Sequence, residues 1–342
     1  MVPMRATDPA TEFDDDGIWF RVESGSAASA VRRAAERLAT QLELGKQRTA
    51  SLSIVAAELT SNLVKHATEG SLLVRPVRSG TTAGVELVAI DSGPGMADLV
   101  GSSRDGHSTT GTWGVGIGAI TRQASWYDAH SVPDRGTVVA VQVWPGLPPG
   151  PAWAAGVTRP LTGEQISGDG FAIRVEEGRH QVLVCDGLGH GPLAATATQA
   201  ARQAFLTAPA VAPAALVEAL HRALGHTRGA ALAVAELDVE AGVLRYAGLG
   251  NIAGTLLGAE ARRGLVSLPG IAGHQRRQVR EYNYPYAAGD TLVMHSDGVN
   301  DRWRPDDYPG LFGRTPVLAA ATVLRDAGVR RDDACVLVAR LP

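Results

Sequence analysis

The run PGLPPGP at positions 145–151 most constrains how this chain of 342 residues can fold. Proline fixes φ and removes a backbone donor, and glycine favours turns, so neither a helix nor a strand can pass through the run. The chain is also longer than one ordinary compact domain. We therefore expect two domains, at 16–145 and 158–342, joined by a Pro/Gly-rich linker at 146–157 and preceded by a flexible tail at 1–15.

Composition narrows the class of protein. Hydrophobic residues make up 45% and charged residues 20%, which is typical of well-packed soluble domains. Lys and Arg number 32 against 35 Asp and Glu, a balance that gives no electrostatic footprint for nucleic acid or an anionic membrane. No apolar run reaches the length of a membrane span, and the polar N-terminus has no signal core. We expect a cytoplasmic protein that binds neither nucleic acid nor membrane; its oligomeric state is not indicated.

The two cysteines, Cys185 and Cys335, each lie inside an apolar run of the kind that forms buried strands. Two cysteines alone cannot build a zinc site or a disulfide framework. We expect both as reduced thiols in the core.

Apolar periodicity predicts helices and strands mixed along both halves. In the first half it predicts helices at 27–44 and 50–67 and strands at 19–22, 72–76, 85–90 and 137–144. In the second half it predicts helices at 192–206 and 213–224 and strands at 171–175, 182–185, 230–236, 244–247, 291–294 and 335–339. This mixture indicates α+β layers and not a regular βαβ series.

A polar face on the helix expected at 50–67 indicates nucleotide chemistry. Glu58, Asn62 and either Lys65 or His66 lie three or four residues apart and share one side of the helix. An Asn oxygen can bind Mg²⁺ beside nucleotide phosphates, and a carboxylate one turn away can orient or deprotonate a hydroxyl. A solvated helix face would produce the same spacing, so this motif alone decides nothing.

Two glycine-containing motifs follow it. The strand ending in DSGPG at 91–95 places a carboxylate beside a glycine turn, where it can accept the exocyclic amine of adenine. The run GTWGVGIG at 111–118, part of a Gly/Ser/Thr-rich loop at 101–118, opens a helix and can present backbone N–H groups to phosphates. The order of the motifs, more than any single one, favours an ATP site.

These motifs, together with Gly136-Thr137, resemble those of the GHKL ATPase/kinase superfamily, and within it the anti-sigma-factor serine kinases of the RsbT/RsbW type. The resemblance implies a two-layer α/β sandwich with the Bergerat ATP-binding fold, which binds ATP with Mg²⁺. It implies Glu58 as the catalytic base, Asn62 as the Mg²⁺ ligand and Asp91 as the adenine anchor. It further implies that the following residues contribute to ATP binding: His66, Gly93, Gly95, Gly114, Gly116, Gly118 and Thr137.

Four aspartates of the second half each follow an apolar run or a glycine, at points where a strand is expected to end: Asp169, Asp186, Asp297 and Asp332. Carboxylates that converge repel one another unless cations lie between them, and hard divalent ions prefer oxygen ligands. Two such ions can activate water and hold a phosphoryl group for in-line displacement. Each Asp-Gly pair alone would read as a turn, but the series predicts a metal centre.

The motifs SGD at 167–169, DGLGHG at 186–191, AGLGN at 247–251, SDGV at 296–299 and RDD at 331–333 resemble the SpoIIE/RsbU/RsbX metal-dependent serine/threonine phosphatases. The resemblance implies a four-layer αββα sandwich with two Mn²⁺ or Mg²⁺ ions. It implies Asp186 as the catalytic, bridging ligand, the Gly187 carbonyl as a further ligand, and Asp169, Asp297 and Asp332 as the remaining metal ligands. His190 is open as a general acid or a turn residue, and Asp333 is expected behind the ligands.

Together the resemblances imply a bifunctional regulator of a bacterial partner-switching, stress-response pathway. Its kinase-like half would phosphorylate a STAS-domain, anti-anti-sigma-type protein, and its phosphatase half would remove such a phosphate; a sigma factor or a downstream phosphatase are further candidate partners. In the alternative reading the ATP domain is a non-catalytic partner-binding or allosteric module of the phosphatase. A metabolic phosphatase would leave the ATP motifs unexplained.

Overall fold

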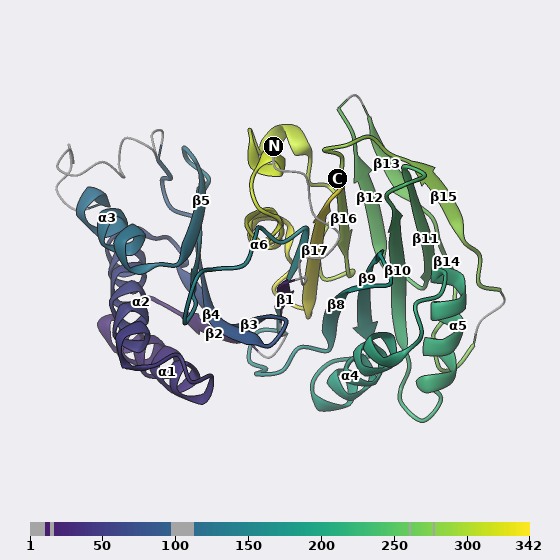
Figure 1. Ribbon diagram of the computed structural model, residues 1–342, viewed down its shortest axis with the longest axis horizontal. Helices are drawn as coiled ribbons and strands as arrows, with labels where there is room; N and C mark the ends of the chain where they lie inside the picture. Colours follow the sequence, from purple (N-terminus) through teal and green to yellow (C-terminus); the bar gives the residue numbers. More distant parts are fainter. Residues whose placement is uncertain (1–10, 14–16, 97–112, 260, 276–277) are drawn as a thin grey trace. The chain divides into compact units, whose positions relative to one another are not determined.

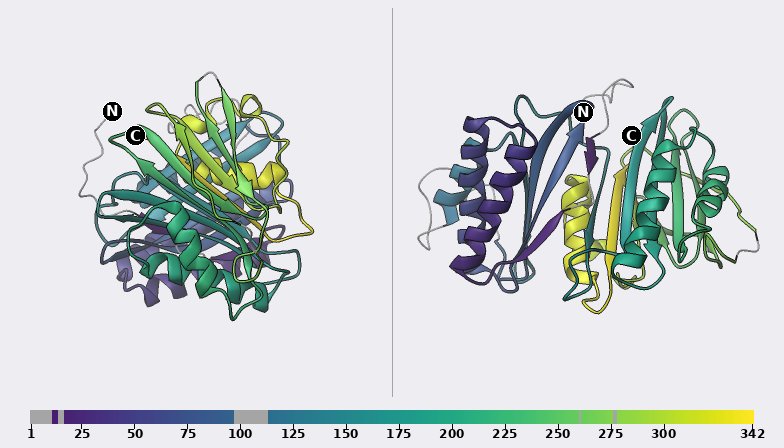
Figure 2. Two further views of the ribbon diagram at one scale, coloured as in Figure 1. Left: turned by 90° about the vertical axis from the view of Figure 1, so that its right-hand side faces the viewer. Right: turned by 90° about the horizontal axis from the view of Figure 1, so that it is seen from below.

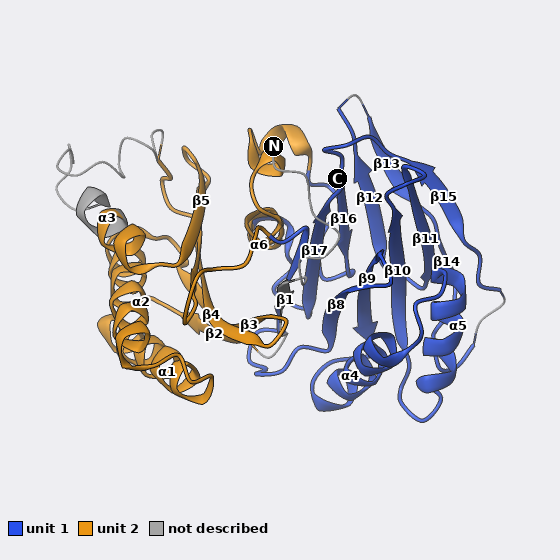
Figure 3. Ribbon diagram, in the orientation of Figure 1, with its two compact units in different colours: residues 1–10, 152–303, 326–342 blue, residues 11–151, 304–325 orange. Residues whose placement is uncertain are grey.

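The computed structural model describes residues 11–13, 17–96, 113–259, 261–275 and 278–342. These residues form an α+β protein whose contacts divide it into two compact units (Figure 3). Unit 1 contains Ala152–Trp303 and Asp326–Pro342, and unit 2 contains Thr11–Pro151 and Arg304–Arg325. Each unit is described separately.

Unit 2 is built on one antiparallel sheet. Its strand order is β1-β3-β4-β6-β5, and β2 also pairs with β3. The strands are β1 (Thr11–Phe13), β2 (Ile18–Arg21), β3 (Ser71–Ser79), β4 (Thr82–Asp91), β5 (Trp126–Val132) and β6 (Gly136–Val143). Only Gly80 and Thr81 separate β3 from β4, and Gly80 has a φ of 56°, as a tight hairpin requires.

Helices α1 (Gly25–Gln41), α2 (Lys46–His66) and α3 (Trp113–Gln123) accompany this sheet, with α1 and α2 against one of its faces (Figure 1). The apolar stripes of α1 and α2 meet alternate residues of the strands in one continuous core, for example Val55 against Leu72 and Leu87. This period match between helix and strand explains why the region folds as a two-layer sandwich.

The opposite face of the same sheet carries a buried polar ladder. Arg75, Glu86 and Gln142 lie side by side on β3, β4 and β6. The Arg75 guanidinium donates to Glu86 Oε2 at 2.6 and 2.8 Å, and Gln142 Nε2 donates to Glu86 Oε1 at 2.8 Å. Trp144 Nε1 then donates to Gln142 Oε1 at 2.9 Å. Arg75 and Glu86 are 2% and 0% exposed, so the hydrogen bonds are what make their burial tolerable.

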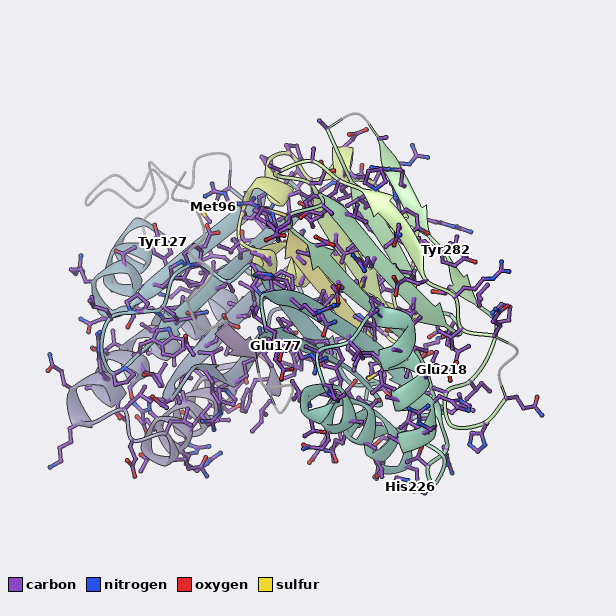
Figure 4. The ribbon with its side chains drawn as sticks, turned by 45° about the vertical axis from the view of Figure 1, so that its right-hand side comes forward. Met96, Tyr127, Glu177, Glu218, His226 and Tyr282 are labelled. Atoms are coloured by element: carbon purple, nitrogen blue, oxygen red, sulfur yellow. The ribbon has the colours of Figure 1, made fainter. Side chains whose placement is uncertain are left out.

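Unit 1 contains two further sheets, in which every strand pair is antiparallel except β11 with β14, which is parallel. One has the order β14-β11-β10-β9-β8, with β15 also paired to β11, and the other has the order β13-β12-β16-β17-β7. The strands of the first are β8 (Asp169–Glu176), β9 (Arg179–Gly187), β10 (Ala230–Asp238), β11 (Val243–Leu249), β14 (Ser267–Leu268) and β15 (Tyr282–Pro285). Those of the second are β7 (Ala154–Arg159), β12 (Ala253–Leu257), β13 (Arg262–Leu265), β16 (Thr291–His295) and β17 (Ala334–Arg340). The β8–β9 hairpin turns at Glu177 and Gly178, with φ values of 51° and 76° (Glu177 is labelled in Figure 4).

Helices α4 (Pro192–Thr207) and α5 (Pro213–Ala223) cover one face of the β8–β11 sheet (Figure 2). Their buried residues form one core with that sheet, in which Phe205 and Leu220 are fully buried. Both helices begin with proline at their first turn, where its missing N–H costs nothing. The expected four-layer arrangement also needs a helix on the other sheet; the helix at this place in the chain, α6 (Pro316–Ala327), groups largely with unit 2.

Three expected boundaries need correction. The expected tail at 1–15 includes β1, which pairs with β3, because Thr11–Phe13 continues the sheet edge. The expected linker at 146–157 includes the start of β7, whose Ala154, Ala155 and Val157 are buried against β17. Residues 304–325, inside the expected second domain at 158–342, group with unit 2 by their contacts.

Both cysteines are buried, as expected. Within the described ranges, no helix is long and apolar enough to cross a membrane.

Candidate functional site

The C-terminal part of α2 presents the polar face that the sequence predicts. Asn62 is buried, while Glu58 and His66 are half-buried at one-turn spacings on either side of it. Lys65 and Val64 point outward, so of the two open candidates His66 completes the face. Burial and Lys65 lower the pKa of His66, and Asp91 acts in the opposite direction, which places the imidazole close to the end of β4.

Asp91 is the last residue of β4 and is only 6% exposed. Its Oδ1 accepts a 2.7 Å hydrogen bond from the Gly93 N–H, and burial raises the pKa of its carboxyl. A Cβ at Gly93 would lie 2.8 Å from both Asp91 Oδ1 and the His66 carbonyl oxygen. The chain therefore passes too close to Asp91 and to the end of α2 for any residue but glycine at position 93.

The β5–β6 turn lies next to the end of β4. Gly95 and Gly136 have φ values of 65° and 90°, and a Cβ at Gly136 would lie 2.0 Å from the Asp91 carbonyl oxygen. Thr137 pairs with Asp91 across β4 and β6, and its hydroxyl lies 2.9 Å from that of Ser131. Ser131 also accepts a 2.7 Å hydrogen bond from the Met96 N–H (Met96 is labelled in Figure 4). Ser131 was not among the expected site residues.

The glycine-rich lid is described only in part. Residues 97–112 of the expected loop lie outside the described residues. Gly114, Gly116 and Gly118 fall within α3, so the helix begins earlier than the sequence indicates. Gly118 is buried. Helix α2, the end of β4 and α3 follow one another along the chain in the order in which the sequence motifs were expected.

A cluster of carboxylates gathers in unit 1 at strand ends. Asp169 begins β8 and lies directly opposite Asp186 near the end of β9. Asp297 lies two residues after β16, and Asp332 lies two residues before β17. Strands β16 and β17 are hydrogen-bonded neighbours in the sheet. All four predicted aspartates therefore come together at one end of the two sheets.

The electrostatics of these aspartates show how close they are. Burial raises the pKa of Asp169 well above its usual range, and the neighbouring Asp186 adds to the rise. Burial and Asp297 raise the pKa of Asp186 to about 7. Burial and Asp297 also raise the pKa of Asp332. A group of acids held together against their own charge is a configuration that cations relieve.

Three further residues fix this cluster, and only one of them was anticipated. Asn251 donates to Asp297 Oδ2 at 2.6 Å, and Ser296 hydrogen-bonds Asp169. Asp333, which was expected behind the ligands, accepts from the Leu161 N–H at 2.7 Å and from the Gly168 N–H at 2.9 Å. Asn251 ends the AGLGN motif, so its position in that motif was the available signal.

Gly187 is the last residue of β9, and His190 lies in the loop that follows it. A Cβ at Gly187 would lie 2.3 Å from the Ala194 carbonyl oxygen, so this position admits only glycine. His190 is exposed, with Nδ1 3.5 Å from Glu164 Oε1, and it lowers the pKa of Asp332. The open ring does not pack in a turn core.

The chemistry of the donor set fits hard divalent ions. Asp169 Oδ2 is buried and has no hydrogen-bond partner among the described residues, an arrangement that a cation or its water would satisfy. No three His, Cys, Asp or Glu side chains in the described part of the chain stand ready as a closed metal shell.

Comparisons with known proteins find matches to both halves of the chain. Residues 22–143 match the family described as histidine kinase-like ATPase domain, and residues 176–342 match the family of stage II sporulation protein E (SpoIIE). The serine/threonine-protein kinase RsbT of Bacillus subtilis (strain 168) is 28% identical over 115 residues, which cover 34% of this chain and 86% of that protein.

The phosphoserine phosphatase RsbX of Bacillus subtilis (strain 168) is 24% identical over 140 residues, which cover 40% of this chain and 70% of that protein. A solved structure from work on the bacterial stressosome, a modular system adapted to control secondary messenger signalling, is 30% identical with a TM-score of 0.52. It covers 55% of this chain and 98% of that chain. This chain therefore joins an N-terminal histidine kinase-like ATPase domain, homologous to the RsbT kinase, to a C-terminal SpoIIE phosphatase domain, homologous to the RsbX phosphatase.

Proposed function

We propose that the chain is a cytoplasmic, bifunctional regulator of a bacterial partner-switching pathway. Its SpoIIE domain would remove phosphate from phosphoserine or phosphothreonine on a STAS-domain, anti-anti-sigma-type protein, and its ATPase domain would phosphorylate such a protein. The observation that carries the proposal is the convergence of Asp169, Asp186, Asp297 and Asp332 at strand ends of unit 1, where Asp169 lies directly opposite Asp186. Unit 2 separately holds the buried Asp91 carboxylate next to the Gly93 turn.

In the phosphatase domain, Asp186 and the Gly187 carbonyl would hold two Mn²⁺ or Mg²⁺ ions together with Asp169, Asp297 and Asp332. When bound, the ions supply Lewis-acid activation of water and neutralise charge on the phosphoryl group. The chain's own residues orient this set: Asn251 holds one oxygen of Asp297, and Ser296 holds Asp169. Asp333 ties the start of β8 to the 160s loop, which fixes the direction of Asp169.

In the ATPase domain, Asp91 would accept the adenine amine, while Gly93 and Gly95 leave room for the base. Asn62 would bind the Mg²⁺ that accompanies ATP, and Glu58, one turn earlier, would take the proton of the attacking hydroxyl. His66 and Thr137 line the same pocket from α2 and β6. Gly114, Gly116 and Gly118 would lie near the phosphates from α3.

Two transfer assays on the full chain test the proposal. A phosphorylated STAS-domain protein supplies the first assay, with Mn²⁺ present and phosphate release as the readout. Asp186→Asn should lower release by about a hundredfold or more, because the bridging carboxylate is lost. Glu240→Gln, which removes an exposed carboxylate from the β10–β11 turn, is the matched control. Full release by Asp186→Asn would contradict the metal assignment.

The second assay follows incorporation of the γ-phosphate of ATP into the unphosphorylated STAS-domain protein. Glu58→Ala should abolish incorporation while leaving phosphate release intact, and Glu43→Gln in the exposed α1–α2 loop serves as control. A stable, ATP-dependent complex without incorporation would instead support the alternative, in which this domain binds the partner and transfers nothing.

A further inference from the structure

The stretch Arg304–Arg325 joins two parts of the molecule in an unusual way. It falls inside the region that matches the SpoIIE family, yet it belongs to the compact unit of the ATPase domain (Figure 3). We call it the excursion segment. Asp297 lies seven residues before it and Asp332 seven residues after it, so two metal-site aspartates flank the two ends of the segment.

The first part of the excursion segment is fastened to β5 of the ATPase domain. Asp128 Oδ2 accepts hydrogen bonds from the Thr315 N–H at 3.2 Å and the Thr315 hydroxyl at 2.9 Å. Asp128 Oδ1 lies 3.4 Å from Arg314 Nη1, and His130 Nε2 lies 3.1 Å from the Pro309 carbonyl oxygen. These contacts set the position at which α6 begins.

The end of the excursion segment reaches the nucleotide pocket. Arg325 Nη1 donates a 3.1 Å hydrogen bond to the Asp91 carbonyl oxygen, and the same guanidinium opposes the burial-raised pKa of Asp91. Asp91 thus holds the Gly93 turn with its carboxylate, while its main-chain carbonyl contacts Arg325 of α6. A shift of Asp91 would therefore change both the Gly93 turn and the contact with α6.

Backbone hydrogen bonds fix the chain between Arg325 and the metal-site aspartates. The Asn300 N–H donates to the Ala327 carbonyl at 2.8 Å, and the Val329 N–H donates to the Gly298 carbonyl at 2.7 Å. A Cβ at Gly298 would lie 1.8 Å from the Asp333 carbonyl oxygen. The turn after Asp297 is therefore in close contact with the loop on either side of Asp332. A shift at the end of α6 would move both.

Helix α6 contains one buried polar group without a partner. Its residues from Pro316 to Leu324 are buried, yet the Thr322 hydroxyl has no hydrogen-bond partner among the described residues. An unmade buried hydrogen bond costs free energy, so an arrangement of α6 that gave this hydroxyl a partner would recover part of that cost. Coupling between distant sites requires such an element with two accessible arrangements.

We propose that Arg325 is a positioning residue that couples adenine binding at Asp91 to the metal affinity of Asp297 and Asp332. The inference rests on the proposed function of the two sites. Ligand binding at Asp91 orders the end of β4 and so orders Arg325 and the loop that follows. Metal binding then pays less ordering entropy, and the two ligands bind with positive cooperativity. By linkage, each raises the affinity for the other by the same factor.

Adenosine is the probe that tests this, because it lacks phosphate and cannot carry Mn²⁺ into the pocket itself. Mn²⁺ binding to the full chain is measured by the electron paramagnetic resonance of free Mn²⁺, with and without saturating adenosine. In the wild type, adenosine should tighten Mn²⁺ binding by about fivefold or more. Adenosine affinity, measured by calorimetry, should rise by the same factor when Mn²⁺ is present.

Arg325→Ala should reduce both shifts to less than about twofold, while Arg325→Lys, which keeps a donor, should restore part of them. Arg33→Ala, an exposed change on α1, is the control and should keep the full shift. Amide exchange of residues 326–333 should slow with adenosine in the wild type and not in Arg325→Ala, which a purely structural role would not produce.

An unchanged shift in Arg325→Ala would overturn the inference, as would the absence of any shift in a wild type that binds both ligands. A wild type that fails to bind adenosine or Mn²⁺, or fails to release phosphate, would instead overturn the proposed function. The two failures are thus distinguishable.

Discussion

Asn251 Nδ2 donates a 2.6 Å hydrogen bond to Oδ2 of Asp297, which ties the loop after β11 to the turn after β16. This hydrogen bond uses one oxygen of the Asp297 carboxylate. It thereby fixes the orientation of the carboxylate and of its other oxygen. Residues that orient metal ligands in this way commonly influence affinity nearly as strongly as the ligands.

Removing that amide should weaken metal binding without unfolding the protein. For Asn251→Ala we expect the Mn²⁺ concentration that half-saturates phosphate release to rise about tenfold. The control is Asn283→Ala, which removes an exposed amide from β15. An unchanged half-saturation would mean that Asp297 needs no help from Asn251.

The carboxylate cluster should cost stability when no metal is bound. Asp186→Asn removes one charge from mutually repelling acids, so the thermal midpoint of the metal-free protein at about pH 8 should rise by roughly 3 °C. Differential scanning calorimetry in a chelator measures it. Added Mn²⁺ should stabilise the wild type more than the variant, and a variant that melts lower than the wild type would refute the repulsion argument.

The nucleotide pocket should be intolerant of a methyl group at Gly136. Gly136→Ala combines a φ of 90° with a Cβ 2.0 Å from the Asp91 carbonyl oxygen, so Asp91 must move. We expect adenosine affinity to fall by about tenfold or more, measured by calorimetry. Gly45→Ala is matched in backbone, with a φ of 80° and nothing within 4 Å of its Cβ. It should keep normal affinity.

His130 should make stability depend on pH. Burial lowers the pKa of His130 below its usual 6.5; the contact with the Pro309 carbonyl and Asp128 oppose this, while Arg325 and Arg314 add to it. The unfolded chain therefore takes up the proton first, and the free energy of unfolding falls as the pH drops below about 6.5.

The measurement is urea unfolding of the wild type and His130→Gln at about pH 7.5 and about pH 5.5. The variant should lose less stability across this interval than the wild type. Equal losses in both proteins would assign the pH dependence to other groups.

Much of both sites could be predicted from the sequence because their residues sit at strand ends and turns with strong local signals. Asp91 before glycine and Asp186 before glycine mark such points directly. Spacing alone could not choose between Lys65 and His66, since both lie within one turn of Asn62; the resemblance favoured His66, which is half-buried while Lys65 is exposed.

The excursion segment could not be anticipated for a different reason. Its helix, α6, is apolar on nearly every side, so no stripe in the sequence indicates which surface it covers. Arg325 carries no motif, and its bond to a main-chain carbonyl leaves no trace in residue type at Asp91. Contacts between segments more than two hundred residues apart depend on tertiary packing alone.

The row formed by Arg75, Glu86 and Gln142 has a consequence for how the ATPase sheet assembles. Side chains alternate between faces, so a one-residue slip of β3 or β4 would drive a guanidinium or a carboxylate into the oily layer beneath the helices. A misaligned pairing would bury a charged side chain without its partner. The free-energy cost of that is far larger than the cost of misplacing an aliphatic side chain. The polar ladder thus specifies a single register of β3, β4 and β6, independently of how much it stabilises the sheet.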